Sequence, residues 1–226
     1  MIRPGKAWLI LRSLPKTVRF NLKYVPLPQA LLLPVLVCHR VYFESLRGTV
    51  RVPPRCRLGM ISIGFGEVGV FDRGRVRSVW HVEGEVIFRG RTGLGHGTRV
   101  SVDSGGVLTF GERFLVAAES AIVCRKAITF GNDVLVSWDV QIMDTDWHRI
   151  IDERGTVLNP DSEVVVGDHV WIGSRVLLMK GVTIARDSVV AAGSVVTRGS
   201  YPPNVILAGV PAREIRQGVS WNEAKP

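Results

Sequence analysis

The sequence predicts an all-β protein built as a parallel β-helix, and three observations support this prediction. Gly is frequent, at 24 residues, which favours many tight turns over long helices. An aliphatic residue recurs at every sixth position of one long stretch: Val166, Ile172, Leu178, Ile184, Val190 and Val196. A small or β-branched residue follows each by four positions: Val170, Val176, Val182, Ser188, Ser194 and Ser200. A period of six fits neither an α-helix nor an alternating strand, whereas it is typical of a β-helix with three flat sides.

The same period continues upstream with interruptions. Its members there are Phe88, Leu94 and Val100, then Phe110, Val116 and Ile122, and after a two-residue slip Phe130, Val136 and Ile142. Stacked coils of this kind share one continuous core. We therefore expect the β-helix at residues 60–200, a basic N-terminal arm at 1–59 and a short C-terminal tail at 201–226.

The predicted arm is strongly basic. Residues 1–60 hold eleven Lys and Arg residues against the single acid Glu44, in a chain of formal net charge +9. Two interpretations stay open: a solvated or subunit-facing arm, and attraction of residues 1–55 to an anionic membrane surface. No nucleic-acid-binding motif accompanies the charge, so we do not expect nucleic acid as a partner. Pro26, Pro28 and Pro34 argue against one long helix, and we expect short helical and extended pieces.

Cysteine usage and hydropathy predict a cytoplasmic protein. Cys38, Cys56 and Cys124 are far apart and form no C-x-x-C pair, which is typical of reduced, intracellular proteins. The apolar run at residues 30–38 is too short to span a bilayer, and it lacks the pattern of a signal peptide. Peripheral contact with the inner membrane face stays open.

One segment, residues 143–163, breaks the six-residue rhythm between regular coils. It reads M-D-T-D-W-H-R-I-I-D-E-R-G-T-V-L-N-P-D-S-E, and is polar and rich in turn-forming residues. Loops that leave a rigid scaffold are frequent carriers of binding and catalytic groups. We therefore expect an extruded active-site loop here.

Five motifs resemble those of the hexapeptide-repeat acyltransferases, and most of all the branch that acts on polysaccharides and other sugars. They are D-T-D-W-H-R-I from Asp144, G-D-H-V-W-I-G-S from Gly167, K-G-V-T-I from Lys180, A-G-S-V-V-T from Ala192 and A-G-V-P-A-R-E-I-R from Ala208. The similarity covers roughly residues 60–216. It implies a left-handed parallel β-helix, a homotrimer with active sites between subunits, and acetyl-CoA as the acyl donor.

The resemblance also implies roles for individual residues. His148 on the loop would be the general base, and the backbone N–H at Ser174 would bind the oxyanion. Contacts with acetyl-CoA would fall on Ser174, Ala192, Thr197, Arg198, Arg213 and Arg216. The arginines suit this role because a guanidinium binds phosphate through forked hydrogen bonds.

The residue types fit transfer of an acetyl group to a hydroxyl. A histidine, with an ordinary pKa of about 6.5, can take the hydroxyl proton near neutral pH. Asp144 and Asp146 would either orient its imidazole or stabilise the turn. Trp147 and Trp171 would either stack on a sugar ring or pack at a subunit seam. No Ser or Cys nucleophile motif is present, which favours direct transfer in a ternary complex.

Other functions stay open on the sequence alone. They are N-acetylation of an amino sugar, O-acetylation of serine, and a non-catalytic β-helix that serves as an interaction module. A zinc enzyme on this scaffold is disfavoured, because His96, His148 and His169 include no pair at metal-ligand spacing. We therefore predict no metal site, and we expect His96 and His169 to be structural or incidental.

Overall fold

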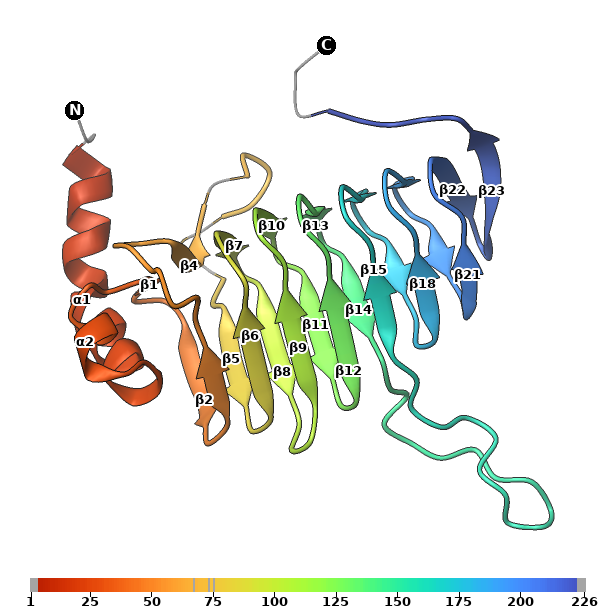
Figure 1. Cartoon of the computed structure of the whole chain (residues 1–226), viewed down its shortest axis with the longest axis horizontal. Coiled ribbons are helices and arrows are strands. Elements are labelled where there is room, and N and C mark those ends of the chain that lie inside the picture. Colours follow the sequence, from red (N-terminus) through yellow and green to blue (C-terminus); the bar gives the residue numbers. More distant parts are fainter. Residues whose placement is uncertain (1–3, 67, 73, 75, 223–226) are drawn as a thin grey trace.

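The computed structural model describes residues 4–66, 68–72, 74 and 76–222. It is an elongated stack of β-coils, with helix α1 (Pro4–Tyr24) at one end and a β-hairpin at the other (Figure 1). Consecutive strands enter three sheets in turn, and strands of successive coils pair in parallel. The predicted left-handed parallel β-helix is confirmed.

The three flat sides of the prism are sheets A, B and C. Sheet A contains β1 (Val35–Val37), β4 (Ile61–Phe65), β7 (Thr92–His96), β10 (Phe114–Ala118), β13 (Leu135–Trp138), β16 (Trp171–Ile172), β19 (Val189–Val190), β22 (Val205–Gly209) and β23 (Ala212–Gln217). Sheet B contains β2 (Tyr42–Leu46), β5 (Val79–Val82), β8 (Arg99–Val102), β11 (Ala121–Cys124), β14 (Gln141–Met143), β17 (Leu177–Leu178) and β20 (Val195–Val196). Sheet C contains β3 (Thr49–Arg51), β6 (Glu85–Phe88), β9 (Val107–Phe110), β12 (Ala127–Phe130), β15 (Val164–Val166), β18 (Val182–Ile184) and β21 (Gly199–Tyr201). The turns between sheets form three edges of the prism, named here the A–B, B–C and C–A edges.

The six-residue repeat supplies the core. In sheet C, Phe130 pairs with Val166 and Val166 with Ile184, so the repeat positions form one inward column. Aromatic rings continue this column toward the N-terminus: the ring centroids of Phe88 and Phe110 lie 5.4 Å apart, and those of Phe110 and Phe130 lie 5.7 Å apart. Every aliphatic or aromatic residue of the predicted repeat is buried. Ser200, predicted at a small inward position, is exposed in β21.

The prism is longer at both ends than residues 60–200. Its first coil, β1 to β3, lies within the predicted arm, and β22 continues sheet A beyond the predicted end. The six-residue pattern hides the first coil because its turns are irregular. Val35 pairs with Ile61, 26 positions later, instead of the regular spacing of 18 seen between Val166 and Ile184.

The remainder of the predicted arm is mainly one long helix, which corrects the expectation of an irregular segment. Helix α1 runs for 21 residues with Pro15 inside it. Pro26 and Pro28 come only after its end, beside and within the short helix α2 (Leu27–Ala30). No helix in the described ranges is both long and apolar enough to cross a bilayer.

Helix α1 covers the open edge of β1 with polar side chains. Asn21 donates from its amide to the Val35 carbonyl (2.7 Å) and accepts from the Val35 N–H (3.2 Å). The Thr17 hydroxyl accepts from the Val37 N–H (3.0 Å) and donates to the Val37 carbonyl (3.2 Å). Ser13 accepts from the N–H of His39 (3.0 Å). Residues four apart lie on one face of a helix, so these three side chains act together as a replacement for a missing strand.

The Asn21→Leu substitution tests this cap. It keeps the branched shape of the side chain but leaves the N–H and C=O of Val35 buried without partners, so we expect the free energy of unfolding to fall by about 2–4 kcal/mol. Urea denaturation measures this change, and amide hydrogen exchange at Val35 should accelerate. Lys23→Met, at an exposed position of the same helix, serves as the control. Unchanged stability and exchange in Asn21→Leu would contradict the capping role.

Candidate functional site

The extruded loop leaves the prism at the B–C edge, between β14 and β15, and projects away from the coils (Figure 1). Asp144 and Thr145 are buried at its start. The Asp144 carboxylate accepts the backbone N–H groups of Arg125 and Lys126, both at 2.8 Å. Its carbonyl accepts the N–H of Ser162 (3.0 Å), which closes the base of the loop. Asp144 therefore anchors the loop to the preceding coil.

Asn159 and Lys180 hold the two arms of the loop together. The Lys180 ammonium lies 2.6 Å from the Asp146 carboxylate and 2.6 Å from the Asn159 carbonyl. The Asn159 amide donates to Asp146 (2.8 Å) and to the His148 carbonyl (2.9 Å), and its oxygen accepts from the Ile150 N–H (2.6 Å). These hydrogen bonds hold the pKa of the Asp146 carboxyl below its ordinary value. We name Asp146, Asn159 and Lys180 the loop clamp.

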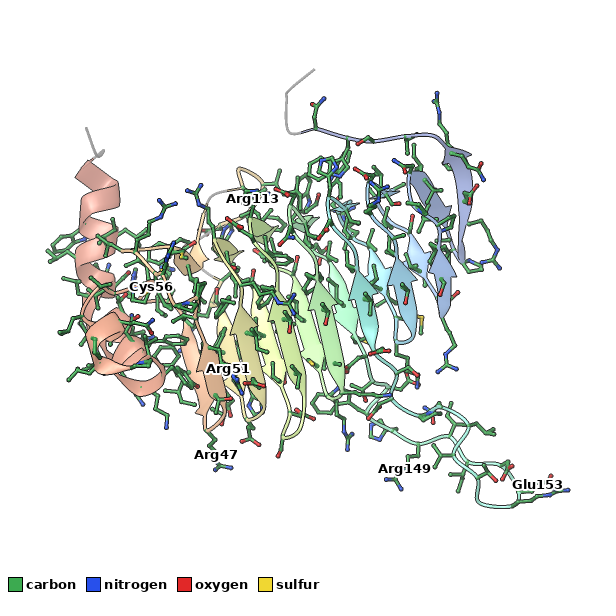
Figure 2. The ribbon with its side chains drawn as sticks, viewed as in Figure 1. Arg47, Arg51, Cys56, Arg113, Arg149 and Glu153 are labelled. Carbon is green, nitrogen blue, oxygen red and sulfur yellow. The ribbon has the colours of Figure 1, made fainter. Side chains whose placement is uncertain are left out.

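The loop clamp fixes the backbone of His148 and leaves its side chain exposed. His148 borders a cavity of about 420 Å³ with Arg125, Trp147, Arg149, Val157, Asn159, Pro160 and Asp161. Arg149 and Glu153 extend from the loop away from the coils (Figure 2). Among the described residues, the hydrogen bonds of the Asp144 and Asp146 carboxylates go to backbone amides and to the clamp, rather than to the His148 imidazole.

The A–B edge brings Ser174 and Ala192 together. Ser174 follows β16, and its carbonyl accepts the N–H of Gly193 in the next coil (2.9 Å). A Cβ at Gly173 would lie 2.7 Å from the Ala192 nitrogen, so only glycine allows the two turns to stack this closely. Two of the residues predicted to contact acetyl-CoA thus form one small-residue column.

The other residues predicted to contact acetyl-CoA lie elsewhere. Thr197 and Arg198 follow β20 at the B–C edge, where the Arg198 guanidinium donates to the Ser162 hydroxyl at the base of the loop. Arg213 and Arg216 are exposed on β23, which pairs antiparallel with β22. Within one chain, the residues predicted to contact acetyl-CoA therefore lie at two edges of the prism and on the terminal hairpin.

Trp147 and Trp171 do not share a surface within one chain. Trp147 is exposed on the loop, whereas Trp171 lies on sheet A and donates from its indole to the Ser137 hydroxyl (3.1 Å). The ring of Trp221 stacks on His169, with centroids 4.7 Å apart, and lies 6.2 Å from Trp171. His169 is also held by Asp187, at 2.9 Å.

A second groove follows the C–A edge of the N-terminal coils. It consists of adjoining cavities of about 580 and 520 Å³ that share Arg57, Met60, Arg91 and Arg113. Arg55 and Arg89 add to its wall, and Leu58, Phe114 and Leu115 to its lining. Figure 2 places Arg113 and Cys56 in this part of the molecule. Arg113 pairs with Asp133 and with Glu112, which also lines the groove, and the other four arginines leave it with a net positive charge.

Sequence reasoning missed Lys180, Asn159 and Trp221. The K-G-V-T-I motif drew attention to Lys180 without assigning it a partner, because its contacts lie 21 or more positions away in the chain. Within the part of the chain that the structure describes, no three His, Cys, Asp or Glu residues gather as a metal site.

The Lys180→Met substitution tests the loop clamp. It removes the ammonium between Asp146 and Asn159, so we expect trypsin cleavage after Arg149 and Arg154 to accelerate by roughly tenfold. The pKa of Asp146 is lowered in the fold, so its contribution to loop stability is present above the ordinary aspartate pKa and is lost as pH falls through the lowered value. As a second readout, the loop of the unsubstituted protein should open as the pH falls through the lowered pKa of Asp146.

Arg175→Met, at an exposed turn position, is the matched control for the clamp and should leave loop cleavage unchanged. Equal cleavage of Lys180→Met and the unsubstituted protein would exclude the clamp.

Comparisons with known proteins agree with this architecture. The family model described as bacterial transferase hexapeptide (six repeats) matches residues 163–198. The putative lipopolysaccharide biosynthesis O-acetyl transferase WbbJ of Escherichia coli K12 is 32% identical over 145 residues, which cover 60% of this chain and 73% of WbbJ. The galactoside O-acetyltransferase of the same strain is 36% identical over 115 residues, or 50% of this chain and 55% of that enzyme.

A solved structure supports the fold. The polySia-specific acetyltransferase NeuO superposes with a TM-score of 0.56 at 24% identity, covering 81% of this chain and 72% of NeuO. At this identity the similarity concerns the fold alone. The repeat, the extruded loop and the similarity over most of WbbJ agree, and the chain therefore belongs to the hexapeptide-repeat transferase family, among its O-acetyltransferases.

Proposed function

We propose that this protein transfers an acetyl group from acetyl-CoA to a hydroxyl of a sugar or a cell-surface polysaccharide unit, with His148 as general base. The observation that carries the proposal is the clamped loop, which holds His148 at a fixed position beside a cavity while leaving its imidazole free to reach a ligand. The sugar O-acetyltransferases among the relatives support the same reaction class.

In the proposed reaction the His148 imidazole takes the proton of the acceptor hydroxyl as its oxygen attacks the thioester carbonyl. The backbone N–H at Ser174 stabilises the negative charge that develops on the carbonyl oxygen. When the intermediate collapses, the carbon–sulfur bond breaks and the thiolate of CoA takes the proton from the imidazolium. The products are an acetyl ester and free CoA. Ala192, Thr197, Arg198, Arg213 and Arg216 are the proposed contacts of acetyl-CoA.

Direct transfer is favoured over an acetyl-enzyme. The pKa of the Cys124 thiol is raised, mainly by burial and also by the carboxylate of Asp144, so this thiol stays protonated at neutral pH. Cys38 is buried as well, and the partly exposed Cys56 lies at the C–A edge, whereas the loop of His148 leaves the B–C edge. A hydroxyl activated by His148 therefore needs only a ternary complex with both substrates.

A homotrimer with active sites between subunits is part of the proposal. His148 leaves the prism at the B–C edge, whereas Ser174 and Ala192 lie on the A–B edge. Trp147 and Trp171 are also separated within one chain, because Trp147 lies on the loop and Trp171 on sheet A. A site that uses both sets of residues is formed when the loop of one subunit reaches the A–B edge of another.

The proposed location is the cytoplasm, with peripheral contact between residues 1–55 and the inner membrane face. Two alternatives are retained: N-acetylation of an amino sugar, and a non-catalytic role as an interaction module. An acetyl ester is released by hydroxylamine under conditions in which an amide is stable, so the product distinguishes the first alternative. Absence of both CoA binding and thiol release would support the second.

The arginine-lined groove lies on a different edge of the prism from His148 and Ser174, and it favours a long acceptor whose carboxylate or phosphate groups bind away from the reacting hydroxyl. Its arginines suit these groups, because a guanidinium binds planar anions through paired hydrogen bonds. Its lining also exposes aliphatic carbon, which suits the apolar faces of sugar rings.

His148→Ala tests the proposed base. We expect acceptor-dependent thiol release from acetyl-CoA to fall by about a hundredfold or more, because the hydroxyl loses its proton acceptor. His169→Asn is the matched control, since His169 has a carboxylate partner but packs beneath Trp221. Loss of activity in His169→Asn with full activity in His148→Ala would reverse the assignment.

The double substitution Arg57→Ser and Arg91→Ser tests the acceptor class. We expect the KM of anionic saccharides to rise about tenfold, because their charge loses its partners, and the KM of neutral saccharides to stay the same. Arg47→Ser, at the B–C edge and paired with Glu83, is the control. A parallel rise for neutral and anionic acceptors would contradict a charge-selective groove.

A further inference from the structure

Helix α1 exposes an apolar stripe along its outer side. The stripe consists of Trp8, Leu11, Leu14, Val18 and Leu22, spaced by three or four residues so that they share one side of the helix. Trp8 is 61% exposed, Leu11 56% and Leu22 57%. Contiguous apolar patches of this kind mark interaction surfaces far more often than single exposed residues do.

The orientation of this stripe is fixed by the fold. The opposite side of α1 is buried: Ser13, Thr17 and Asn21 hydrogen-bond to the edge of β1, and Phe20 belongs to the core. Rotation of the helix to bury the apolar stripe would break these bonds. The protein therefore holds a hydrophobic helix face outward at the N-terminal end of the prism.

The apolar surface continues beyond α1. Leu27 in α2, and Leu31 and Leu32 in the turn that follows it, are exposed, with Leu31 at 74%. Helices α1 and α2 contact each other and cover the same end of the prism (Figure 1). The two segments together form one exposed apolar end, which we name the N-terminal face.

Basic residues border the stripe. Arg12, Arg19 and Lys23 are exposed and spaced by seven and four residues, so they form a row beside it on α1. Lys16, in the same row, is turned toward the fold and donates to the Val41 carbonyl. Glu44 is the single acid among residues 1–60, so little negative charge opposes this row.

We propose that the N-terminal face docks on an anionic lipid bilayer, with α1 lying in the membrane surface. A basic amphipathic helix binds there by burying its apolar side at the headgroup boundary while Lys and Arg meet the lipid phosphates. A Trp side chain is favoured at the same depth. The inference rests on the proposed function, whose membrane contact it assigns to the N-terminal face, and it depends on the enzyme activity only for its purpose, which is to bring the enzyme to an acceptor at the membrane.

Charge favours a bilayer over a second copy of the chain. Two N-terminal faces brought together would place the rows of Arg12, Arg19 and Lys23 of both copies close to one another without acidic partners. An anionic surface offers those residues the opposite charge and offers the stripe an apolar interior.

Co-sedimentation of the full chain with vesicles tests the proposal. We expect binding to vesicles that contain about one quarter phosphatidylglycerol in phosphatidylcholine, and weaker binding to phosphatidylcholine alone or at high salt. The double substitution Leu11→Ser and Leu22→Ser, and separately Arg12→Glu with Lys23→Glu, should each reduce binding by about tenfold or more. Lipids brominated on their chains should quench tryptophan fluorescence in the unsubstituted protein and less in Trp8→Phe.

The matched control is Val210→Ser with Ile215→Ser, which removes two exposed apolar side chains at the opposite end of the prism and should leave vesicle binding unchanged. All four variants alter exposed positions, and far-UV circular dichroism verifies their folding. Absence of vesicle binding in the unsubstituted protein, or equal loss in the control, would overturn the proposal. A change of mass in solution upon Leu11→Ser and Leu22→Ser, without vesicle binding, would assign the face to chain–chain contact and also overturn it.

Acetyl transfer to a soluble acceptor separates this inference from the proposed function. The stripe variants should retain it, because they lie outside the loop and the A–B edge. Vesicle binding without any acetyl transfer would leave the docking intact and contradict the enzyme function alone.

Discussion

Each coil of this protein takes its position from the coil before it, through parallel backbone hydrogen bonds and an inward side chain at every sixth residue. The number of inward positions in each coil is therefore fixed, whereas extra residues can be inserted in the turn between two strands. The loop at 144–163 demonstrates this: sheet C resumes with Phe130 opposite Val166 although the chain between β14 and β15 has left the prism. A loop that carries catalytic or binding residues can therefore be inserted at an edge of the prism without altering the core.

The same constraint explains how much of the fold could be predicted. Wherever three apolar residues spaced by six fall within one coil, the pattern identified the buried residues, including Phe88 and Phe110 in coils longer than 18 residues. The first coil escaped because its turns have other lengths. Helix α1 escaped for a different reason: Ser13, Thr17 and Asn21 lie on its buried side beside Phe20, and most of its large apolar residues face outward. Hydrophobic periodicity predicts the reverse, in which apolar residues lie on the buried side of a helix and polar residues on the exposed side.

The candidate site was predicted in part. The interruption of the repeat located the loop, and the resemblance located His148 and Ser174. The partners of Asp144 and Asp146 could not be read from the sequence, because Arg125, Asn159 and Lys180 meet them only after coils have stacked. The aspartates near the histidine hold the loop rather than the imidazole in one chain. Rigidity of the loop backbone, in place of a carboxylate partner, is what positions the candidate base.

A parallel sheet normally ends in a row of unpaired amides and carbonyls that another molecule can extend, and a solenoid has such a row at each terminus. In sheet A, the hydroxyls of Ser13 and Thr17 and the amide of Asn21 occupy these groups at the start. At the finish, the hairpin reverses direction and presents Arg213, Glu214 and Arg216 along its last strand. Strand addition to sheet A is thereby opposed at both ends. The side chains of one helix and one charged strand thus fix the length of this sheet, where the repeat alone would permit its continued growth.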